Sequence, residues 1–87
     1  MEITPQAEKE LKKYREGKEG SFVRFYIKGI GWGGKIQFGM SLEEAKEAKD
    51  HEIKLQDLSL ILDNETNQKM EGKVLDYQGM RFEIYNK

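Results

Sequence analysis

The hydrophobic positions at the start of the chain recur with a helical period. Thr4 is a favourable N-cap, and Pro5 follows at the first helical position, where a missing backbone N–H costs nothing. Three apolar residues then recur at i, i+4 and i+7 and form one narrow stripe: Ala7, Leu11 and Tyr14. Gly17 and Gly20 are placed to end the helix. The pattern predicts one N-terminal helix whose other faces are charged and solvated.

After this helix the hydrophobic pattern changes to alternation. Residues 22–28 and 36–40 place apolar side chains at every second position, which is typical of half-buried strands. The set expected to face inward is Val23, Phe25, Ile27, Ile36, Phe38 and Met40. The glycine-rich segment between the two strands predicts a hairpin connection. For residues 41–49, the spacing of Ser41 and Glu44 is that of a capping box and favours a short helix, but a surface turn or loop is equally compatible.

The next segment alternates in the same way. Residues 53–55 and 58–62 predict two strands, and in the second of them Ile61 points away from the alternating leucines. The strand pattern then stops at Asp63-Asn64. Either of these two residues can cap a short helix. The sequence therefore predicts two strands followed by a second, shorter helix.

The last part of the chain predicts a hairpin. Gly72 closes the short helix, and two strands follow across a Gln78-Gly79 turn, with Phe82 and Ile84 in phase on the second strand. The order of elements is one helix, strands, a short helix and further strands. This order indicates an α+β fold, in a single small domain of residues 1–87.

Composition and charge exclude several classes of function. The 87 residues include 15 basic and 16 acidic side chains, for a net charge of -1, so neither nucleic acid nor an anionic membrane surface is a predicted partner. The longest apolar run, around residues 58–62, is too short to span a bilayer. The polar N-terminus lacks the apolar region of a signal peptide, so a cytoplasmic protein is expected.

The chain has no cysteine and one histidine, His51. Without cysteine there is no thiolate metal ligand, no cysteine nucleophile and no thiol redox chemistry. His51 is expected to be an ordinary surface residue near the start of a strand. The acidic residues within 43–50 alternate with lysines and are interpreted as a solvated face, since the pattern of a Ca²⁺ loop is absent. No acid–base pair or nucleophilic triad can be assigned, so neither an enzyme nor a cofactor or metal site is predicted.

The only tryptophan, Trp32, lies between Gly31 on one side and Gly33 and Gly34 on the other. This stretch follows a strand, but it lacks the Lys-Ser/Thr of a phosphate-binding loop, and a strand rather than a helix comes next. Nucleotide binding is therefore not predicted. These four residues form the candidate loop for a partner or ligand.

From Ile3 to Asn86 the chain resembles the HesB-like family, the A-type iron–sulfur cluster carriers. The similar segments are EITPQAEKELKKY at the start, VRFYIKGIGWGGKIQF across the glycine loop, and LILDNETNQKMEGKVLDYQGMRFEIYN in the second half. Their order and spacing carry the resemblance. It implies an N-terminal helix packed on two small mixed or antiparallel β-sheets, and a role in assembling or delivering iron–sulfur clusters.

The resemblance also implies a ligand set that this sequence does not contain. The carriers bind iron or cluster through three cysteines, one inside the glycine loop and two in a Cys-x-Cys tail. Here Trp32 stands at the loop position, and the sequence ends at Lys87 without such a tail. Because iron–sulfur clusters are held above all by thiolates, the chain is interpreted as a degenerate member of the family without cluster ligands.

Two roles for Trp32 and three functions of the protein follow. The indole either fills the space vacated by the ligand, for which partial burial is expected, or stays exposed as an anchor for a partner. The predicted function is a non-catalytic binding or adaptor protein with protein partners of iron–sulfur assembly. One alternative is an unconventional iron or cluster carrier that works as an oligomer with carboxylate, His51 or external thiol ligands. The other is a small enzyme or small-molecule binder that reuses the loop. The sequence specifies neither the partner nor the oligomeric state.

Overall fold

The computed structural model describes residues 1–87, and its first elements are the strand β1 (Glu2–Ile3) and the helix α1 (Pro5–Tyr14). The predicted cap is confirmed, because the Thr4 hydroxyl accepts a hydrogen bond from the Ala7 N–H at 3.2 Å. Ala7 and Leu11 of the predicted stripe are fully buried. Tyr14, the third residue of the stripe, is instead 44% exposed, and its hydroxyl donates to the Met40 carbonyl. The helix therefore buries a narrow stripe and leaves its charged faces in solvent.

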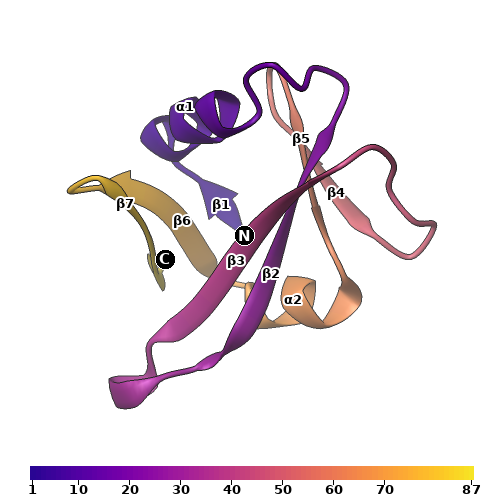
Figure 1. The fold of residues 1–87 in the computed structure, drawn as a ribbon. Coiled ribbons are helices and arrows are strands. Elements are labelled where there is room, and N and C mark those ends of the chain that lie inside the picture. Colours follow the sequence, from indigo (N-terminus) through magenta and orange to yellow (C-terminus); the bar gives the residue numbers. More distant parts are fainter.

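A four-stranded sheet forms the larger layer of the molecule (Figure 1). Its strands, in spatial order, are β3 (Ile36–Glu43), β2 (Phe22–Ile30), β5 (Ser59–Leu62) and β4 (His51–Lys54). β2 pairs antiparallel with β3 and parallel with β5, and β4 pairs antiparallel with β5. The long β2–β3 hairpin extends beyond the other strands, and its tip is the lowest part of the molecule in Figure 1.

A three-stranded sheet in the order β1-β6-β7 forms the second layer. Its two longer strands are β6 (Lys73–Gln78) and β7 (Arg81–Asn86). Gly79 and Met80 form the turn between them, one residue later than the predicted turn at Gln78-Gly79. Their φ angles of 59° and 67° are positive, as a two-residue hairpin turn of this type requires. α2 (Asn64–Lys69) joins β5 to β6, and the Asp63 carboxylate caps it by accepting from the Thr66 N–H at 2.7 Å. Neither helix is long and apolar enough to cross a membrane.

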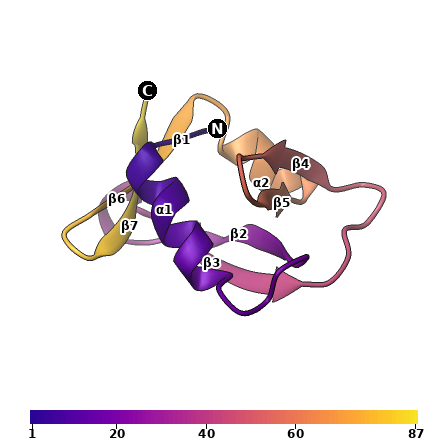
Figure 2. The same cartoon turned by 90° about the horizontal axis from the view of Figure 1, so that it is seen from above.

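The core lies where α1 meets the two sheets, and Figure 2 shows α1 between the β6–β7 hairpin and the β4–β5 pair. Its buried residues are Ala7, Leu11, Val23, Phe25, Leu58, Leu60, Leu62, Met70 and Leu75. This set confirms the predicted inward faces of β2 and β5. Ile61 points to the opposite face, as predicted, but is also fully buried, because its register partners Arg24 and Glu52 lie beside it there.

Residues 41–49 contain no helix. β3 continues through Ser41 and Leu42 to Glu43, and the Leu42 side chain packs against the core. The backbone of these residues is therefore engaged in strand pairing with β2, and only turns follow until β4 begins. The capping-box interpretation of Ser41 is wrong, and the alternative of a surface turn describes residues 44–50.

Candidate functional site

The candidate loop forms the tip of the β2–β3 hairpin, and Trp32–Gly34 make one turn of 3₁₀ helix. Two backbone hydrogen bonds close it: the Gly31 N–H donates to the Lys35 carbonyl at 2.7 Å, and the Gly34 N–H donates to the Gly31 carbonyl at 3.2 Å. Gly33 and Gly34 have φ angles of 72° and 77°, in the left-handed region that favours glycine. The glycines therefore allow a tight, closed loop that presents Trp32.

Trp32 is 100% exposed, so the expected partial burial of its indole is wrong. The β2–β3 hairpin carries the loop past the core, and the neighbouring glycines offer no side chains against which an indole could pack. Ile30, at the end of β2, is also mostly exposed. Of the two roles considered for Trp32, the buried plug is therefore excluded, and the loop presents a large apolar side chain to solvent.

The side chains of the loop do not suit an iron–sulfur cluster. Cluster iron is bound by cysteine thiolates and, in some centres, by histidine nitrogens. The indole N–H of Trp32 is a hydrogen-bond donor only. No three His, Asp or Glu side chains of the molecule are grouped as metal ligands would be. His51 is an exposed residue at the start of β4, as predicted, with its Nε2 atom 3.1 Å from Asn64 Oδ1. The donor set of a cluster carrier is therefore absent from this loop.

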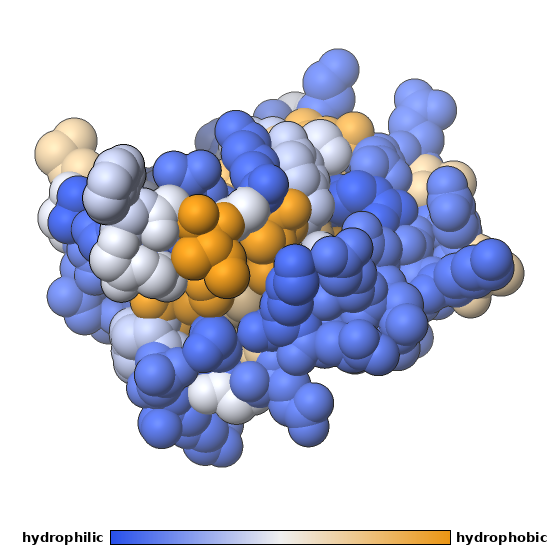
Figure 3. Space-filling model, turned by 90° about the horizontal axis from the view of Figure 1, so that it is seen from below, coloured by the Kyte–Doolittle hydropathy of each residue, from blue (hydrophilic) through white to orange (hydrophobic).

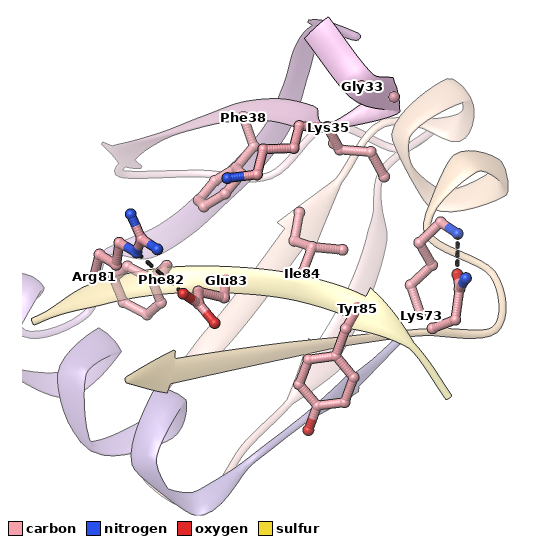
Figure 4. Close-up of a pocket in the computed structure, with 12 residues that line it drawn as sticks. Gly33, Lys35, Phe38, Lys73, Arg81, Phe82, Glu83, Ile84 and Tyr85 are labelled. Atoms are coloured by element: carbon pink, nitrogen blue, oxygen red, sulfur yellow. Dashed lines mark hydrogen bonds and ion pairs between the residues drawn. The ribbon is translucent and has the colours of Figure 1, made fainter. Parts of the chain in front are cut away.

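A groove of about 460 Å³ lies beside the loop, between β3 and β7 (Figure 4). Gly33 and Gly34 line one end of it. Figure 4 shows Phe38 of β3 and Ile84 of β7 directed into the space between the two strands. On the underside of the molecule, Figure 3 shows apolar side chains gathered in the middle and polar side chains around them. The groove joins the predicted loop to a strand of the second sheet, a contact that the sequence did not predict.

The charged side chains of this groove are mostly cationic. Lys35, Lys73 and Arg81 line it, against a single carboxylate, Glu83. Arg81 Nε lies 3.0 Å from Glu83 Oε1, and Lys73 donates to the Asn86 side-chain oxygen. Lys35 takes part in none of the ion pairs of the structure. The groove is therefore lined by both apolar and polar side chains, and its charged groups are positive in sum.

The acidic segment 43–50 is more than a solvated face. Arg24 donates to both Asp50 carboxylate oxygens, at 2.6 and 3.0 Å, and to the Glu43 carboxylate at 2.7 Å. The Asp50 side chain is 3% exposed. The hydrogen bonds from Arg24 lower the pKa of Asp50, although burial opposes this shift. For Asp50 the solvated interpretation is wrong. Arg24, a cation within a half-buried strand, was the signal that a partner must lie nearby.

A second buried carboxylate ties the N-terminus to the second sheet. Asp76 is 4% exposed and accepts hydrogen bonds from the Thr4 hydroxyl, from the Tyr77 N–H at 2.8 Å and from the Gln78 side-chain amide at 2.7 Å. These bonds, that of Thr4 first, lower the pKa of Asp76. The hydrogen bond from Thr4, the N-cap of α1, ties the start of that helix to β6, and the other two bonds are made within β6 itself. This network supports the fold and faces neither the loop nor the groove.

Comparison with known proteins identifies the fold. Neither a protein-family model nor a curated protein matches the sequence. Among solved structures, Escherichia coli SufA, involved in biosynthesis of iron–sulfur clusters, is similar with a TM-score of 0.72 and 17% identity over 98% of this chain and 78% of its own. IscA with its [2Fe-2S] cluster is similar with a TM-score of 0.70 and 20% identity, over 98% of this chain and 80% of its own. A protein from Aquifex aeolicus, solved by NMR in solution, is similar with a TM-score of 0.79 and 24% identity, over 100% of this chain and 91% of its own.

These similarities bear on the architecture of the chain. The expected α+β arrangement, with one main helix on two small sheets, is confirmed. The similarity to SufA and IscA covers 98% of this chain, yet the chain contains no cysteine. The protein therefore has the HesB-like, A-type carrier fold in a cysteine-free form.

Proposed function

We propose that the protein is a non-catalytic binding or adaptor protein of iron–sulfur cluster assembly. Its fold is that of SufA and IscA, which supports a role in this process. The absence of cysteine supports a role in which the chain does not hold the cluster with its own thiolates. The observation that carries the proposal is the exposed Trp32 on a closed glycine loop.

An exposed tryptophan on an ordered loop is well suited to recognition. A tryptophan side chain offers a large apolar surface at low conformational cost, and tryptophan is enriched among the residues that dominate binding energy. The two backbone hydrogen bonds and the left-handed glycines already fix the loop before a partner arrives. Less entropy is then lost on binding. Ile30 extends the apolar surface next to Trp32, so a partner could cover both residues together.

Affinity capture from native cytosol tests this function. Proteins retained by the wild-type chain are compared by mass spectrometry with those retained by Trp32→Ala. Met80→Ala is the matched control, because Met80 is also an exposed apolar residue at a hairpin turn. We expect proteins of iron–sulfur assembly on the wild type and on Met80→Ala, and their loss from Trp32→Ala. Equal capture by Trp32→Ala would contradict the anchor role.

Anaerobic reconstitution distinguishes an adaptor from the alternative, a carrier that works as an oligomer with non-cysteine or external ligands. After incubation with iron and sulfide and desalting, an adaptor is expected to remain colourless. A brown protein that retains stoichiometric iron would favour the carrier instead. This test is needed because IscA, which has the same fold, has been solved with a [2Fe-2S] cluster.

A further inference from the structure

The groove beside the glycine loop is bordered by two sheet edges. β3 pairs only with β2, and β7 pairs only with β6. The Lys87 N–H donates to the Gly72 carbonyl and so continues the β6–β7 ladder. Because the backbone groups of a strand point alternately to its two sides, those of Phe82, Ile84 and Asn86 point away from β6. β7 therefore presents the N–H and C=O groups of three residues to a further strand.

This edge of β7 lacks most of the usual protection of an exposed edge. Protected edges are very short, or carry proline, bulges or charged side chains that prevent further pairing. The two charged side chains of β7, Arg81 and Glu83, pair with each other at 3.0 Å. β7 has six residues, contains no proline, and pairs with β6 without a register shift. The outer edge of β3 is partly used, since the Tyr14 hydroxyl donates to the Met40 carbonyl at 3.1 Å. Of the two edges, β7 is the one open to an added strand.

The lining of the groove indicates which strand would fit. Its rim carries three cations, Lys35, Lys73 and Arg81, and one carboxylate. Its walls include the side chains of Phe38 and Ile84. In an extended peptide successive side chains point to opposite faces, so alternating apolar and acidic residues would meet both surfaces at once. A volume of about 460 Å³ is enough for a few such side chains.

We propose that the free edge of β7 binds an extended acidic segment of a partner protein as an additional β-strand. The main chain of the segment pairs with Ile84 and its neighbours, which supplies affinity. Its carboxylates lie near Lys35 and Lys73, which supplies the preference for acidic sequences. This inference rests on the proposed function, because it gives the chemistry of the partner that the adaptor recognises.

Other occupants of the groove fit less well. A second copy, paired edge to edge about a two-fold axis, would bring the cations of one groove toward those of the other. A nucleic acid or an anionic membrane would meet this small cationic rim on a chain whose net charge is -1. The combination of an open edge with local positive charge favours a short acidic strand.

NMR of the ¹⁵N-labelled full chain tests the proposal. The probe is a synthetic ten-residue peptide that alternates Val or Ile with Asp or Glu. In the free protein we expect the Ile84 amide to exchange rapidly with solvent, and in the presence of the peptide we expect it to become protected. The matched probe has Lys at every acidic position, and we expect it to bind at least about tenfold more weakly. An Ile84 amide already protected in the free protein, or equal binding of the two peptides, overturns the proposal.

Two charge reversals locate the binding surface. Lys35 lines the groove, whereas Lys18 lies in the exposed segment after α1 and takes part in none of the ion pairs of the structure. The two variants are Lys35→Glu and Lys18→Glu. We expect Lys35→Glu to weaken binding of the acidic peptide by about tenfold and Lys18→Glu to leave it unchanged. Equal losses in the two variants overturn the proposal. So does binding to anionic phospholipid vesicles without binding to the peptide, or a dimer in sedimentation that protects Ile84 without any peptide.

This experiment can fail independently of the proposed function. Trp32 does not line the groove, so Trp32→Ala is expected to keep the affinity for the acidic peptide. If Trp32 is needed for partner capture but the acidic peptide does not bind, the strand-addition inference is wrong and the adaptor function stands. If the peptide binds and protects Ile84 while no partner is captured, the groove assignment stands and the adaptor function is wrong.

Discussion

The two ends of the β2–β3 hairpin are held in opposite ways. Near its base, Arg24 makes three hydrogen bonds of 2.6 to 3.0 Å to Asp50 and Glu43, and the Asp50 side chain is almost inaccessible. At its tip, two backbone hydrogen bonds close a loop whose Trp32 contacts solvent on all sides. The base of the hairpin is held by the ion pairs that Arg24 makes, whereas the side chain at its tip makes no such contacts. Stability and recognition are therefore separable along the same two strands.

The largest effect is expected at the base. Arg24→Met removes the guanidinium and leaves Asp50 buried without its cationic partner, so we expect a loss of about 2–4 kcal/mol in the free energy of unfolding. Urea denaturation measures it. Lys12→Met is the matched control, because Lys12 pairs with Asp57 at the exposed surface and should change stability by less than about 0.5 kcal/mol. Similar losses of unfolding free energy in the two variants would mean that the Arg24–Asp50 pair stabilises the fold no more than the exposed Lys12–Asp57 pair does.

The pH dependence of the melting temperature gives a second readout of this comparison. Arg24 lowers the pKa of Asp50 below its ordinary value of 3.8, so ionised Asp50 stabilises the native state, and that stability is lost as the pH falls through the native pKa. The wild type should lose melting temperature below about pH 4 more steeply than Arg24→Met. Glu52 and Asp76 also have lowered pKa values and leave a residual slope in the variant. Identical acid slopes would contradict the role of the Arg24 pair.

A smaller effect is expected where the hairpin turns. A Cβ at Gly34 meets no atom within 4 Å, but its φ of 77° strains any L-residue, so Gly34→Ala should cost about 1 kcal/mol. Gly29→Ala is the matched control, because the space there is equally open and no positive φ applies. Its effect should be neutral or slightly stabilising. Thermal unfolding of the two variants measures the difference, and an equal cost would show that the loop does not need its left-handed glycines.

The features predicted from the sequence are those set by neighbouring residues. The Thr4 cap of α1 and the inward side chains of β2 depend on spacing along a few residues, and both are confirmed. Burial of Trp32 depends instead on how far the hairpin projects beyond the core, which no local pattern specifies. The Thr4–Asp76 contact joins residues 72 positions apart in the chain, and the Arg24–Asp50 contact joins residues 26 apart.

The candidate site divides in the same way. The loop Gly31–Gly34 was predicted, because glycines around a lone tryptophan are visible in the sequence. The groove was missed, because it forms only where β3 of one sheet faces β7 of the other. A single signal could have pointed to it: the predicted final hairpin ends in an alternating strand for which the sequence offers no further partner strand.

The smallest effect on stability is expected at the tip. Trp32 is fully exposed, so its removal creates no cavity, and Trp32→Ala should change the free energy of unfolding by less than about 0.5 kcal/mol. Because Trp32 is the only tryptophan, the emission of the native protein reports on this side chain alone. We expect red-shifted emission that acrylamide quenches efficiently. Blue-shifted emission together with a loss of about 3 kcal/mol or more in Trp32→Ala would restore the buried plug and remove the contrast between base and tip.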